Sequence, residues 1–333
     1  MIPSVGRAPN GLPPYPNGWY AVAWSSEVGQ GDVVSRIVCG SEVVIFRTAT
    51  SIGVMEAHCP HLGANLGMGG TIDGEAIRCP FHGFCFDTSG RCVATGYGGE
   101  IPAGLVARTW PVREVDGAIF IWHHNKGREP GWELPDFDPT GFGRLVHRSY
   151  RLRDHPQETT ENSVDLGHFS VVHGYEDVAL TKEVRTDGPY LNIGYRARRP
   201  LRPLGRWGPS LQTSFTYDIN IHGLGYSQVD VAIPGQGLQA RLLVLATPRD
   251  GEMIDLRLGL RLRDPSERKG ALRLLPSVLV RAAATPFILN GFASDANQDF
   301  PIWENKAYVS PPRLARGDGP IGLYRKWADQ FYA

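Results

Sequence analysis

The chain has 333 residues, of which 42% are hydrophobic, and its 34 basic and 34 acidic side chains cancel to zero formal net charge at pH 7. Because nucleic-acid binders carry a basic surface, this balance argues against a partner of DNA or RNA. No apolar run reaches the ~20 residues that span a bilayer, and residues 1–18 have no apolar signal core, so we expect a cytoplasmic protein without a transmembrane segment.

The length predicts two domains, at a prior of about 150 residues per domain, and we expect them at residues 1–128 and 129–333. After a Pro- and Gly-rich arm, the first domain shows short β-branched or aromatic runs separated by Gly or charged residues, which is typical of an all-β domain. The polar segment 125–138 follows as the expected boundary. The expected strands are 19–25, 35–40, 42–48, 52–57, 76–81 and 117–124.

The second domain is expected to be α+β, with longer strands that suit a large antiparallel sheet. These expected strands are 150–153, 213–223, 227–235, 239–248 and 253–264. Helical stretches are few, at about 156–172, 266–284, 285–299 and 323–333.

Two short segments of the first domain each contain one cysteine and one histidine. Cys59 and His61 are followed, after 17 residues, by Cys79 and His82. A structural zinc site is the competing interpretation, but zinc fingers usually pair cysteine with cysteine and histidine with histidine. One ligand of each kind from each loop suits a Rieske-type [2Fe–2S] cluster, in which two thiolates bind one iron and two imidazoles bind the other. The remaining cysteines are expected to be buried and structural: Cys39, Cys85 and Cys92.

A second group of possible ligands begins in the expected helix 156–172. Asp165 and His168 are three residues apart, so a helix would place them on nearly the same face, whereas His173 requires the helix to distort or end. Two histidines with one distant carboxylate form the facial triad that holds Fe(II) and leaves positions open for O₂ and substrate. Asp299 is the favoured carboxylate, and Asp295 is the alternative, expected on the surface of a helix.

The order C-x-H-x₁₇-C-x₂-H, N-x₂-D-x₂-H-x₄-H and a late Gln-Asp resembles the α subunit of the Rieske non-haem iron oxygenases over nearly the whole chain. Within that family it resembles most the cholesterol 7-desaturases and, more loosely, the 3-ketosteroid 9α-hydroxylases. The segments that carry this narrower resemblance are 16–20 (PNGWY), 59–67 (CPHLGANLG), 108–122 (RTWPVREVDGAIFIW), 298–308 (QDFPIWENKAY) and 317–332 (GDGPIGLYRKWADQFY).

The chain departs from one related group. Rieske subunits of respiratory complexes resemble it in this motif but carry an extra cysteine in each loop, at the positions of Ala64 and Phe81 here. No disulfide is therefore expected beside the cluster, which favours the lower potential of an oxygenase centre.

The resemblance implies a Rieske β domain followed by a helix-grip catalytic domain, assembled as a homotrimer. It implies that Cys59, His61, Cys79 and His82 hold the cluster and that His168, His173 and Asp299 hold a mononuclear Fe(II). It places Asn162 near that iron and Asp165 between it and a cluster histidine of the neighbouring subunit. In this chain the Asp165 carboxylate is expected to accept the ring N–H of His168.

The expected function is the O₂-dependent hydroxylation or desaturation of an apolar polycyclic substrate, a steroid or sterol. The chain has no Gly-rich dinucleotide fingerprint, so electrons from NAD(P)H are expected to arrive through a separate reductase and a ferredoxin. Two alternatives stay open, an aromatic-ring hydroxylase of the same superfamily and a Rieske electron carrier. A carrier would need neither the histidine pair nor Asp299.

Overall fold

The computed structural model describes residues 11–201, 211–263, 274 and 276–333. The chain divides into two compact units. The N-terminal unit consists of Pro14–Phe137 with the short segment Thr247–Gly251, and the C-terminal unit consists mainly of Asp138–Ala246 and Glu252–Ala333. The division therefore falls at the end of the polar segment 125–138.

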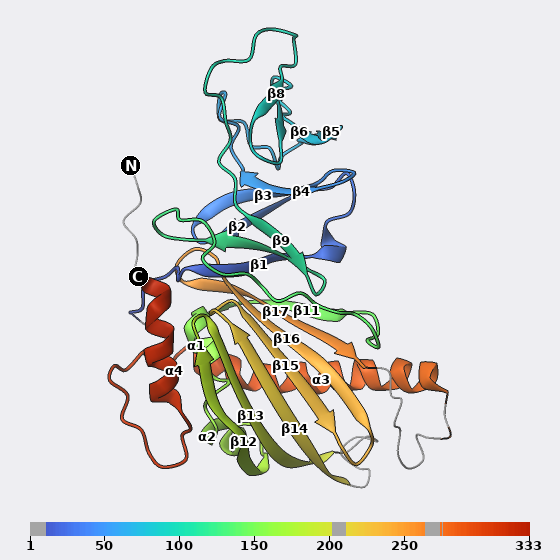
Figure 1. Ribbon diagram of the computed structural model, residues 1–333, viewed down its shortest axis with the longest axis vertical. Coiled ribbons are helices and arrows are strands. Elements are labelled where there is room, and N and C mark those ends of the chain that lie inside the picture. Colours follow the sequence, from blue (N-terminus) through green and yellow to red (C-terminus); the bar gives the residue numbers. More distant parts are fainter. Residues whose placement is uncertain (1–10, 202–210, 264–273, 275) are drawn as a thin grey trace. The chain divides into compact units, whose positions relative to one another are not determined.

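The N-terminal unit is all-β, as expected, apart from one 3₁₀ turn at Ser25–Glu27 (Figure 1). Its described strands form three antiparallel sheets with the orders β1-β10-β9, β2-β3-β4 and β5-β6-β7-β8. The strands β5, β7, β8 and β9 were not predicted, because three or four residues give too short a pattern to read. The strand bounds are β1 Gly18–Trp24, β2 Val33–Val38, β3 Ser41–Arg47, β4 Ile52–Glu56, β5 Thr71–Asp73, β6 Ala76–Arg78, β7 Cys85–Asp87, β8 Cys92–Ala94, β9 Val112–Val115 and β10 Ala118–His123.

Two apolar cores hold this unit together. One surrounds β1, in which all seven residues are buried, and includes Tyr20, Ile45 and Ile121. The other contains Phe46, Met55, Leu66, Ile77 and Phe86, together with Cys59 and Cys79. The two cysteines are therefore fixed by the packing of aliphatic and aromatic side chains rather than by surface loops.

The C-terminal unit is built on a seven-stranded antiparallel sheet with the order β11-β17-β16-β15-β14-β13-β12. This large sheet confirms the expected α+β class. Its strand bounds are β11 Val146–Arg153, β12 Glu176–Asp187, β13 Tyr190–Leu201, β14 Leu211–His222, β15 Tyr226–Ile233, β16 Leu238–Pro248 and β17 Met253–Leu262. The strands β12 and β13 were missed, since β12 is a largely exposed, charged edge strand and β13 also carries several arginines.

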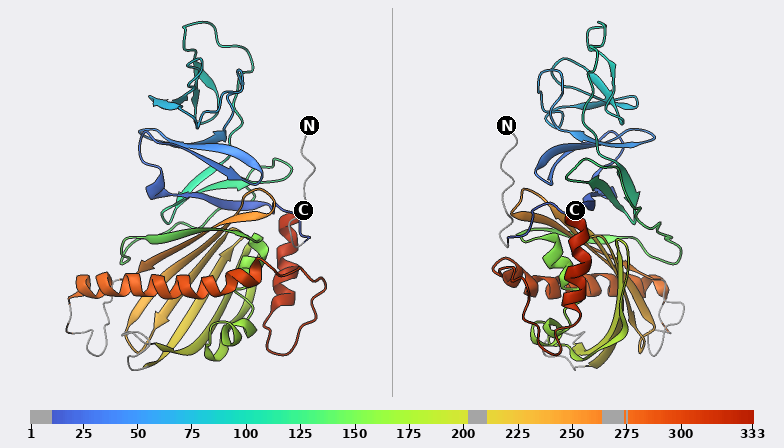
Figure 2. Two further views of the ribbon diagram at one scale, coloured as in Figure 1. Left: turned by 180° about the vertical axis from the view of Figure 1, so that it is seen from behind. Right: turned by 60° about the vertical axis from the view of Figure 1, so that its left-hand side comes forward.

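The long helix α3, Ser277–Trp303, lies across one face of this sheet (Figure 2, left). We expected two helices, 266–284 and 285–299, but the described part is one helix that continues through Pro286. Proline in a helix removes one backbone hydrogen bond, and the packing of α3 against β11 and β17 supports the helix. Residues 266–273 and 275 of the expected helix 266–284 lie outside the described residues.

The expected helix 156–172 is interrupted, and this interruption shapes the site. It consists of α1, Pro156–Glu161, and α2, Gly167–Val171. The expected C-terminal helix is present as α4, Ile321–Ala328, followed by a 3₁₀ turn, Asp329–Tyr332. None of the described helices combines the length and the apolarity that crossing a bilayer requires.

Candidate metal centres

The two Cys/His loops have the same backbone structure. The N–H of Cys59 donates to the carbonyl of Ala64 at 2.8 Å, and the N–H of Gly63 donates back to the Cys59 carbonyl at 2.9 Å. The same pair of bonds, at 2.8 and 3.1 Å, closes the loop that begins at Cys79. Both turns depend on a glycine with positive φ, at Gly63 (77°) and Gly83 (69°). Two equivalent loops therefore each present one thiol and one imidazole.

The four side chains differ in burial in a way that suits a [2Fe–2S] cluster. Cys59 and Cys79 are 2% and 3% exposed, whereas His61 and His82 are only half-buried, with ring centroids 4.9 Å apart. Burial, together with the neighbouring Cys79, raises the pKa of the Cys59 thiol to about 11. Such a buried thiol pair needs a cationic centre to become thiolate, and the half-exposed imidazoles of His61 and His82 would hold the second iron of such a cluster.

The other three cysteines form no disulfide within the described residues. Cys39 and Cys85 are buried, as expected for structural cysteines, and Cys92 is only half-buried. Phe81 is 63% exposed and packs its ring against His82. It occupies the place of the extra cysteine of the respiratory proteins.

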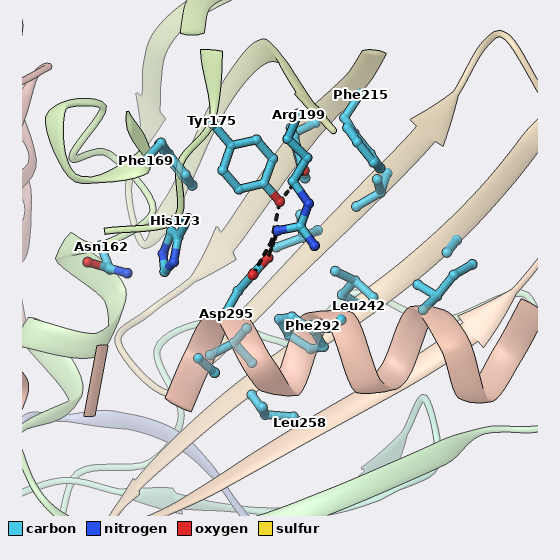
Figure 3. Close-up of a pocket in the computed structure, with 18 of the residues that line it drawn as sticks. Asn162, Phe169, His173, Tyr175, Arg199, Phe215, Leu242, Leu258, Phe292 and Asp295 are labelled. Carbon is cyan, nitrogen blue, oxygen red and sulfur yellow. Dashed lines mark hydrogen bonds and ion pairs between the residues drawn. The ribbon is translucent and has the colours of Figure 1, made fainter. Parts of the chain in front are cut away.

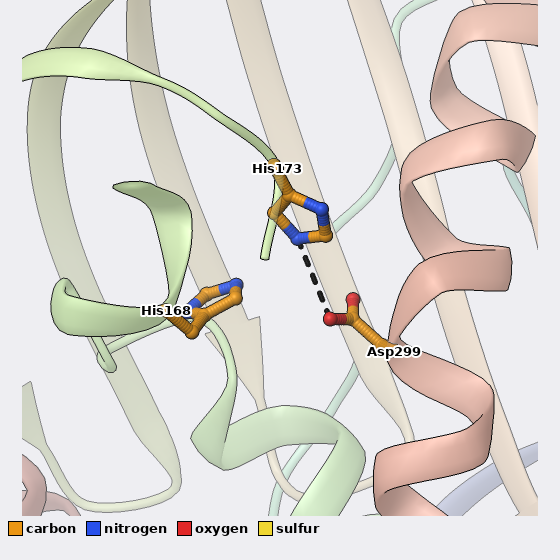
Figure 4. A group of neighbouring side chains, drawn as sticks. All are labelled: His168, His173 and Asp299. Carbon is orange, nitrogen blue, oxygen red and sulfur yellow. Dashed lines mark ion pairs between the residues drawn. The ribbon is translucent and has the colours of Figure 1, made fainter. Parts of the chain in front are cut away.

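In the C-terminal unit, His168, His173 and Asp299 come together from three elements (Figure 4). His168 lies in α2, His173 follows its end, and Asp299 projects from α3. Their ligand atoms lie within 4.8 Å of one another, and His173 Nε2 is 3.4 Å from Asp299 Oδ1. Two imidazoles and one carboxylate form the donor set of the facial triad. Within the described residues, no other group of His, Cys, Asp and Glu side chains is gathered as closely for a single ion.

The break between α1 and α2 allows both histidines to face Asp299. The segment around Gly319 packs into this break, and Leu166 N–H donates to the carbonyl of Asp318 at 3.1 Å. A Cβ at Gly319 would lie 2.3 Å from the carbonyl oxygen of Val164, so only glycine permits this approach. The segment around Gly319 thus packs between the end of α1 and the start of α2.

Each histidine is held by its outer ring nitrogen. His168 Nδ1 is 2.6 Å from the main-chain oxygen of Asp165, and His173 Nδ1 is 2.9 Å from Oε1 of Gln298. These contacts turn both Nε2 atoms toward Asp299 and fix the tautomers, as is usual for metal ligands. The sequence motif includes Gln298 in its late Gln-Asp, but no role for this residue was predicted from the sequence.

The expected contact of the Asp165 carboxylate differs from the observed one. Asp165 Oδ1 is 3.9 Å from His168 Nδ1, and it accepts instead the main-chain N–H of His168 at 3.2 Å. The reason is that α2 begins just after Asp165, so the carboxylate pairs with an N–H of the first helical turn while its carbonyl takes the ring. The carboxylate itself is 32% exposed.

Asn162 connects two of the ligands. Its Nδ2 lies 3.1 Å from His168 Nε2 and 3.1 Å from Asp299 Oδ2. An amide group has two N–H donors, so it can hold both ligand atoms at once. The expectation that Asn162 lies near the iron ligands agrees with this geometry.

The two histidines differ in protonation. Burial lowers the pKa of His168, although Asp165 and Asp299 oppose the effect. Burial also acts to lower the pKa of His173, but hydrogen bonds to Asp299 and Gln298 outweigh it and raise the pKa. Burial therefore favours the neutral form of His168, whereas the contacts with Asp299 and Gln298 favour the protonated form of His173.

Asp295, the alternative carboxylate, has other partners. Both of its oxygens lie 2.8 Å from Nη1 of Arg199, and its Oδ2 accepts the hydroxyl of Tyr175 at 3.1 Å. The expectation that Asp295 lies on a helix surface is wrong, since the side chain is 21% exposed and lines a cavity. Sequence reasoning also missed Arg199, because its strand β13 was not predicted.

The three ligands open into a cavity of about 740 Å³ between α3 and the sheet (Figure 3). This volume is within the range of small-molecule sites. Most of its wall is aliphatic or aromatic, including Phe215, Ile219, Val231, Leu242, Leu258 and Phe292.

Two family models match the chain. Residues 18–103 match the Rieske [2Fe-2S] domain, and residues 121–332 match the 3-ketosteroid 9alpha-hydroxylase C-terminal domain. Cholesterol 7-desaturase nvd of Bombyx mori is 32% identical over 96% of this chain and 70% of its own length. The probable 3-ketosteroid-9-alpha-monooxygenase oxygenase component of Rhodococcus rhodochrous is 28% identical over 97% of this chain and 82% of its own.

Solved structures show the same fold at low identity. Dicamba monooxygenase bound to dicamba is 21% identical and has a TM-score of 0.70, covering 95% of this chain and 96% of its own. NdmA of Pseudomonas putida CBB5 is 16% identical, with a TM-score of 0.69 over 94% of this chain and 89% of its own. The cysteine and histidine loops, the antiparallel sheet with its long helix and the two family matches lead to one conclusion: the chain belongs to the Rieske oxygenase family, in the group that contains the 3-ketosteroid 9α-hydroxylases and the cholesterol 7-desaturases.

Proposed function

We propose that this Rieske oxygenase hydroxylates or desaturates a steroid or sterol. The observation that carries the proposal is the cavity of about 740 Å³, which is mostly apolar and contains His168, His173 and Asp299 in its wall. A rigid polycyclic hydrocarbon body would bury its surface against such a wall, at about 25 cal/mol per Å² of apolar area removed from water. The named activities of the relatives, cholesterol 7-desaturase and 3-ketosteroid 9α-monooxygenase, support this substrate class.

The mononuclear iron would be held by His168, His173 and Asp299, and when bound it would supply the activation of O₂. The chain's own residues prepare this position. Asn162 and Gln298 orient the ligand atoms through the hydrogen bonds described above, and the apolar wall keeps bulk water from the bound substrate.

The cluster would be held by Cys59, His61, Cys79 and His82 in the domain that we assign to residues 1–128, and the iron site belongs to the domain 129–333. Electrons would come from NAD(P)H through a separate reductase, with a ferredoxin as the direct donor. Both reactions consume one O₂, two electrons and two protons. Hydroxylation inserts one oxygen atom and releases one water, whereas desaturation removes two hydrogen atoms from the substrate and releases two waters.

We further propose that the active form is a homotrimer in which Asp165 links the two metal sites of neighbouring chains. One oxygen of this carboxylate accepts the His168 main-chain N–H, and the side chain is 32% exposed, so its other oxygen can accept an imidazole N–H from a second chain. His61 and His82 present such half-exposed rings.

The test is turnover by the iron-loaded enzyme with NADPH and a surrogate ferredoxin and reductase. Sterols, ketosteroids and aromatic acids are offered in parallel, and products are read by mass as gain of one oxygen or loss of two hydrogens. Products from sterols or ketosteroids are expected, with about three irons bound per chain. Products from aromatic acids alone would make the enzyme an aromatic-ring hydroxylase, and two irons without any product would make it an electron carrier.

A further inference from the structure

The cavity wall contains a charged pair in addition to the iron ligands. Arg199 extends from β13 and Asp295 from α3, and they meet inside the cavity (Figure 3). Nη1 of Arg199 lies 2.8 Å from both carboxylate oxygens, and the two side chains are 20% and 21% exposed. Removing two charges from water is costly, so a pair in an otherwise apolar wall needs an explanation.

The carboxylate of this pair has two partners, Arg199 and Tyr175. Tyr217 donates its hydroxyl to Tyr175 at 3.1 Å, and Tyr175 donates to Asp295 at 3.1 Å. Burial, with the nearby Asp295 charge, raises the pKa of Tyr175 to about 12, so its phenol keeps the proton at neutral pH. Asp295 thus accepts from one arginine nitrogen and one phenol.

The arginine of the pair has donors left over. Among the described residues, Nε and Nη2 of Arg199 have no hydrogen-bond partner, while its guanidinium packs 4.9 Å from the ring centre of Tyr175. The facing position on α3 is Gly291, where an added Cβ would lie 3.7 Å from Nη2. The lack of a side chain there leaves space in front of the free edge of the guanidinium.

We propose that this free edge of Arg199 binds an uncharged oxygen acceptor, a ketone or a hydroxyl, on an otherwise apolar polycyclic substrate. The inference rests on the proposed function and specifies which members of the substrate class bind. The pair is neutral as a whole, so a substrate carboxylate would bring an uncompensated negative charge next to Asp295. A neutral oxygen meets a charge-assisted donor without that cost.

The position of the pair gives it a role in orientation. Asp295 and Asp299 are one turn apart on α3, about 6 Å along the helix axis. An oxygen held at Arg199 therefore fixes one end of a rigid ring system relative to His168 and Asp299. The competing explanation is that the pair only braces β13 against α3, and a brace would not distinguish a ketone from the corresponding hydrocarbon.

The experiment compares matched ligands that share one ring skeleton: the hydrocarbon, the ketone, the alcohol and the carboxylate. Dissociation constants are measured by equilibrium dialysis with the iron-loaded enzyme, and KM and kcat are measured separately with the surrogate reductase. The same dialysis is run with fluorene and fluorenone, which are planar but not steroids. The variant is Arg199→Met with Asp295→Leu, which removes the pair as a unit and leaves no unpaired charge.

A matched control removes the pair Arg241 and Asp230, which join β16 to β15 at 2.8 and 3.0 Å and do not line this cavity. The control carries Arg241→Met with Asp230→Leu. A second test variant, Gly291→Leu, leaves the Arg199 pair intact and fills the space in front of the guanidinium.

The native enzyme is expected to bind the ketone or the alcohol roughly 10-fold to 100-fold more tightly than the hydrocarbon, as one charge-assisted hydrogen bond allows. The ratio of dissociation constants should fall to within about threefold in the Arg199/Asp295 variant and in Gly291→Leu, and should persist in the control. In the kinetic measurements, the loss in these two variants should appear mainly in KM. Equal native affinities, an unchanged ratio in both test variants, or tightest binding of the carboxylate would overturn the proposal.

The outcomes separate the two proposals. Selective binding of ketones without any product from steroids would refute the proposed function and leave the role of Arg199 standing. Products from steroids together with equal affinity for ketone and hydrocarbon would support the proposed function and refute the role of Arg199. If no steroid binds, the fluorene and fluorenone ratio decides the role of Arg199 by the same criterion.

Discussion

The two candidate metal centres differ in which of their candidate ligand side chains are buried. In the Cys/His loops, the ligands that become anionic are thiols in an apolar core, and the neutral imidazoles are half-exposed. The C-terminal unit instead buries several carboxylates, since Asp154, Glu158, Glu161 and Asp299 are each at most 7% exposed. The first centre leaves its histidines half-exposed, whereas the second includes a buried carboxylate, Asp299.

The difference shows what each region needs to be stable. A thiol is neutral until metal binds, so burying it costs little, and no partner cation is required. Buried carboxylates need partners, and the C-terminal unit supplies them: Arg325 contacts Glu161 at 2.6 and 2.8 Å, and Lys306 pairs with Glu158. Among the described residues, Asp299 contacts His173 and the amide of Asn162 but no lysine or arginine, which suits it to receive a cation.

The largest effect is expected from removing an iron ligand. His168→Ala or Asp299→Ala should lower turnover by more than roughly 100-fold. Loss of a residue that only hydrogen-bonds to a metal ligand already lowers activity or metal affinity by about 10-fold to 100-fold, and loss of the ligand itself should cost more. Bound iron should fall from about three to about two atoms per chain, while the visible spectrum of the cluster stays unchanged. Iron analysis checks this, with Asp295→Ala as the comparison. Loss of iron from Asp295→Ala but not from Asp299→Ala would reverse our choice of carboxylate.

The next effect concerns the link between the centres. Asp165→Asn keeps a side-chain acceptor for the His168 main-chain N–H but removes the charge. We expect both metals to stay bound and the trimer to form, with electron delivery slowed by about 100-fold. This is the upper end of the range for mutating a residue that hydrogen-bonds to a metal ligand. Single-turnover rates of the reduced enzyme measure this. Native rates in the variant, or full activity in a monomer, would remove the bridging role.

The cluster side is tested by His82→Cys. A thiolate in place of an imidazole should lower the reduction potential by roughly 100 mV or more, because cysteine-only clusters have lower potentials than Rieske clusters. The altered EPR spectrum and a redox titration report the change. Cys92→Ser, a half-buried cysteine outside the ligand set, serves as the control and should leave both unchanged. Zinc without acid-labile sulfide in the native protein would refute the cluster itself.

A smaller effect is expected at Gln298. Gln298→Leu removes the acceptor of His173 Nδ1–H and should weaken iron binding by about 10-fold to 100-fold without affecting the cluster. Asn297→Ala, at the exposed neighbouring position, is the matched control. Competition with a chelator measures the iron affinity. Equal affinities of the two variants would show that Gln298 does not support the ligand.

The smallest effect tests the cost of buried carboxylates. Burial raises the pKa of Asp154 to about 7, from 3.8, against the hydrogen bond from Thr159. Between about pH 4 and pH 7, the Asp154 carboxyl therefore keeps its proton in the folded protein but has lost it in the unfolded chain. Native stability falls as the pH rises through this window. Asp154→Asn removes that loss and should stabilise the protein by about 2–3 kcal/mol more at pH 8 than at pH 5.

Thermal unfolding midpoints at pH 5 and pH 8 measure this difference. Asp255→Asn is the control, since Asp255 pairs with Arg151 at 2.9 Å on strands β17 and β11. A gain for Asp154→Asn that is the same at both pH values would mean that the Asp154 carboxyl does not titrate in this range.

How much the sequence determined differs between the two centres. Cys59, His61, Cys79 and His82 lie within one short segment, and the glycines beside them already indicate the turns that present the ligands. Local geometry is encoded by local residues, so the cluster could be predicted with its individual ligands. The all-β and α+β classes were predictable for the same reason, since alternating and β-branched runs reflect the local backbone.

The iron site depended on the tertiary structure. The sequence indicated His168 and His173 and favoured Asp299 over Asp295. Both carboxylates lie on one helix, however, and its packing against the sheet determines which of them faces the histidines. The role of Gln298 as a partner of His173 was not predicted, and Arg199 was not predicted at all. Arg199 lies on a strand whose charged sequence gives no β signal, and it meets Asp295 only because β13 and α3 border the same cavity. Contacts between residues distant in sequence are set by the folding of the whole sheet, and no local pattern records them.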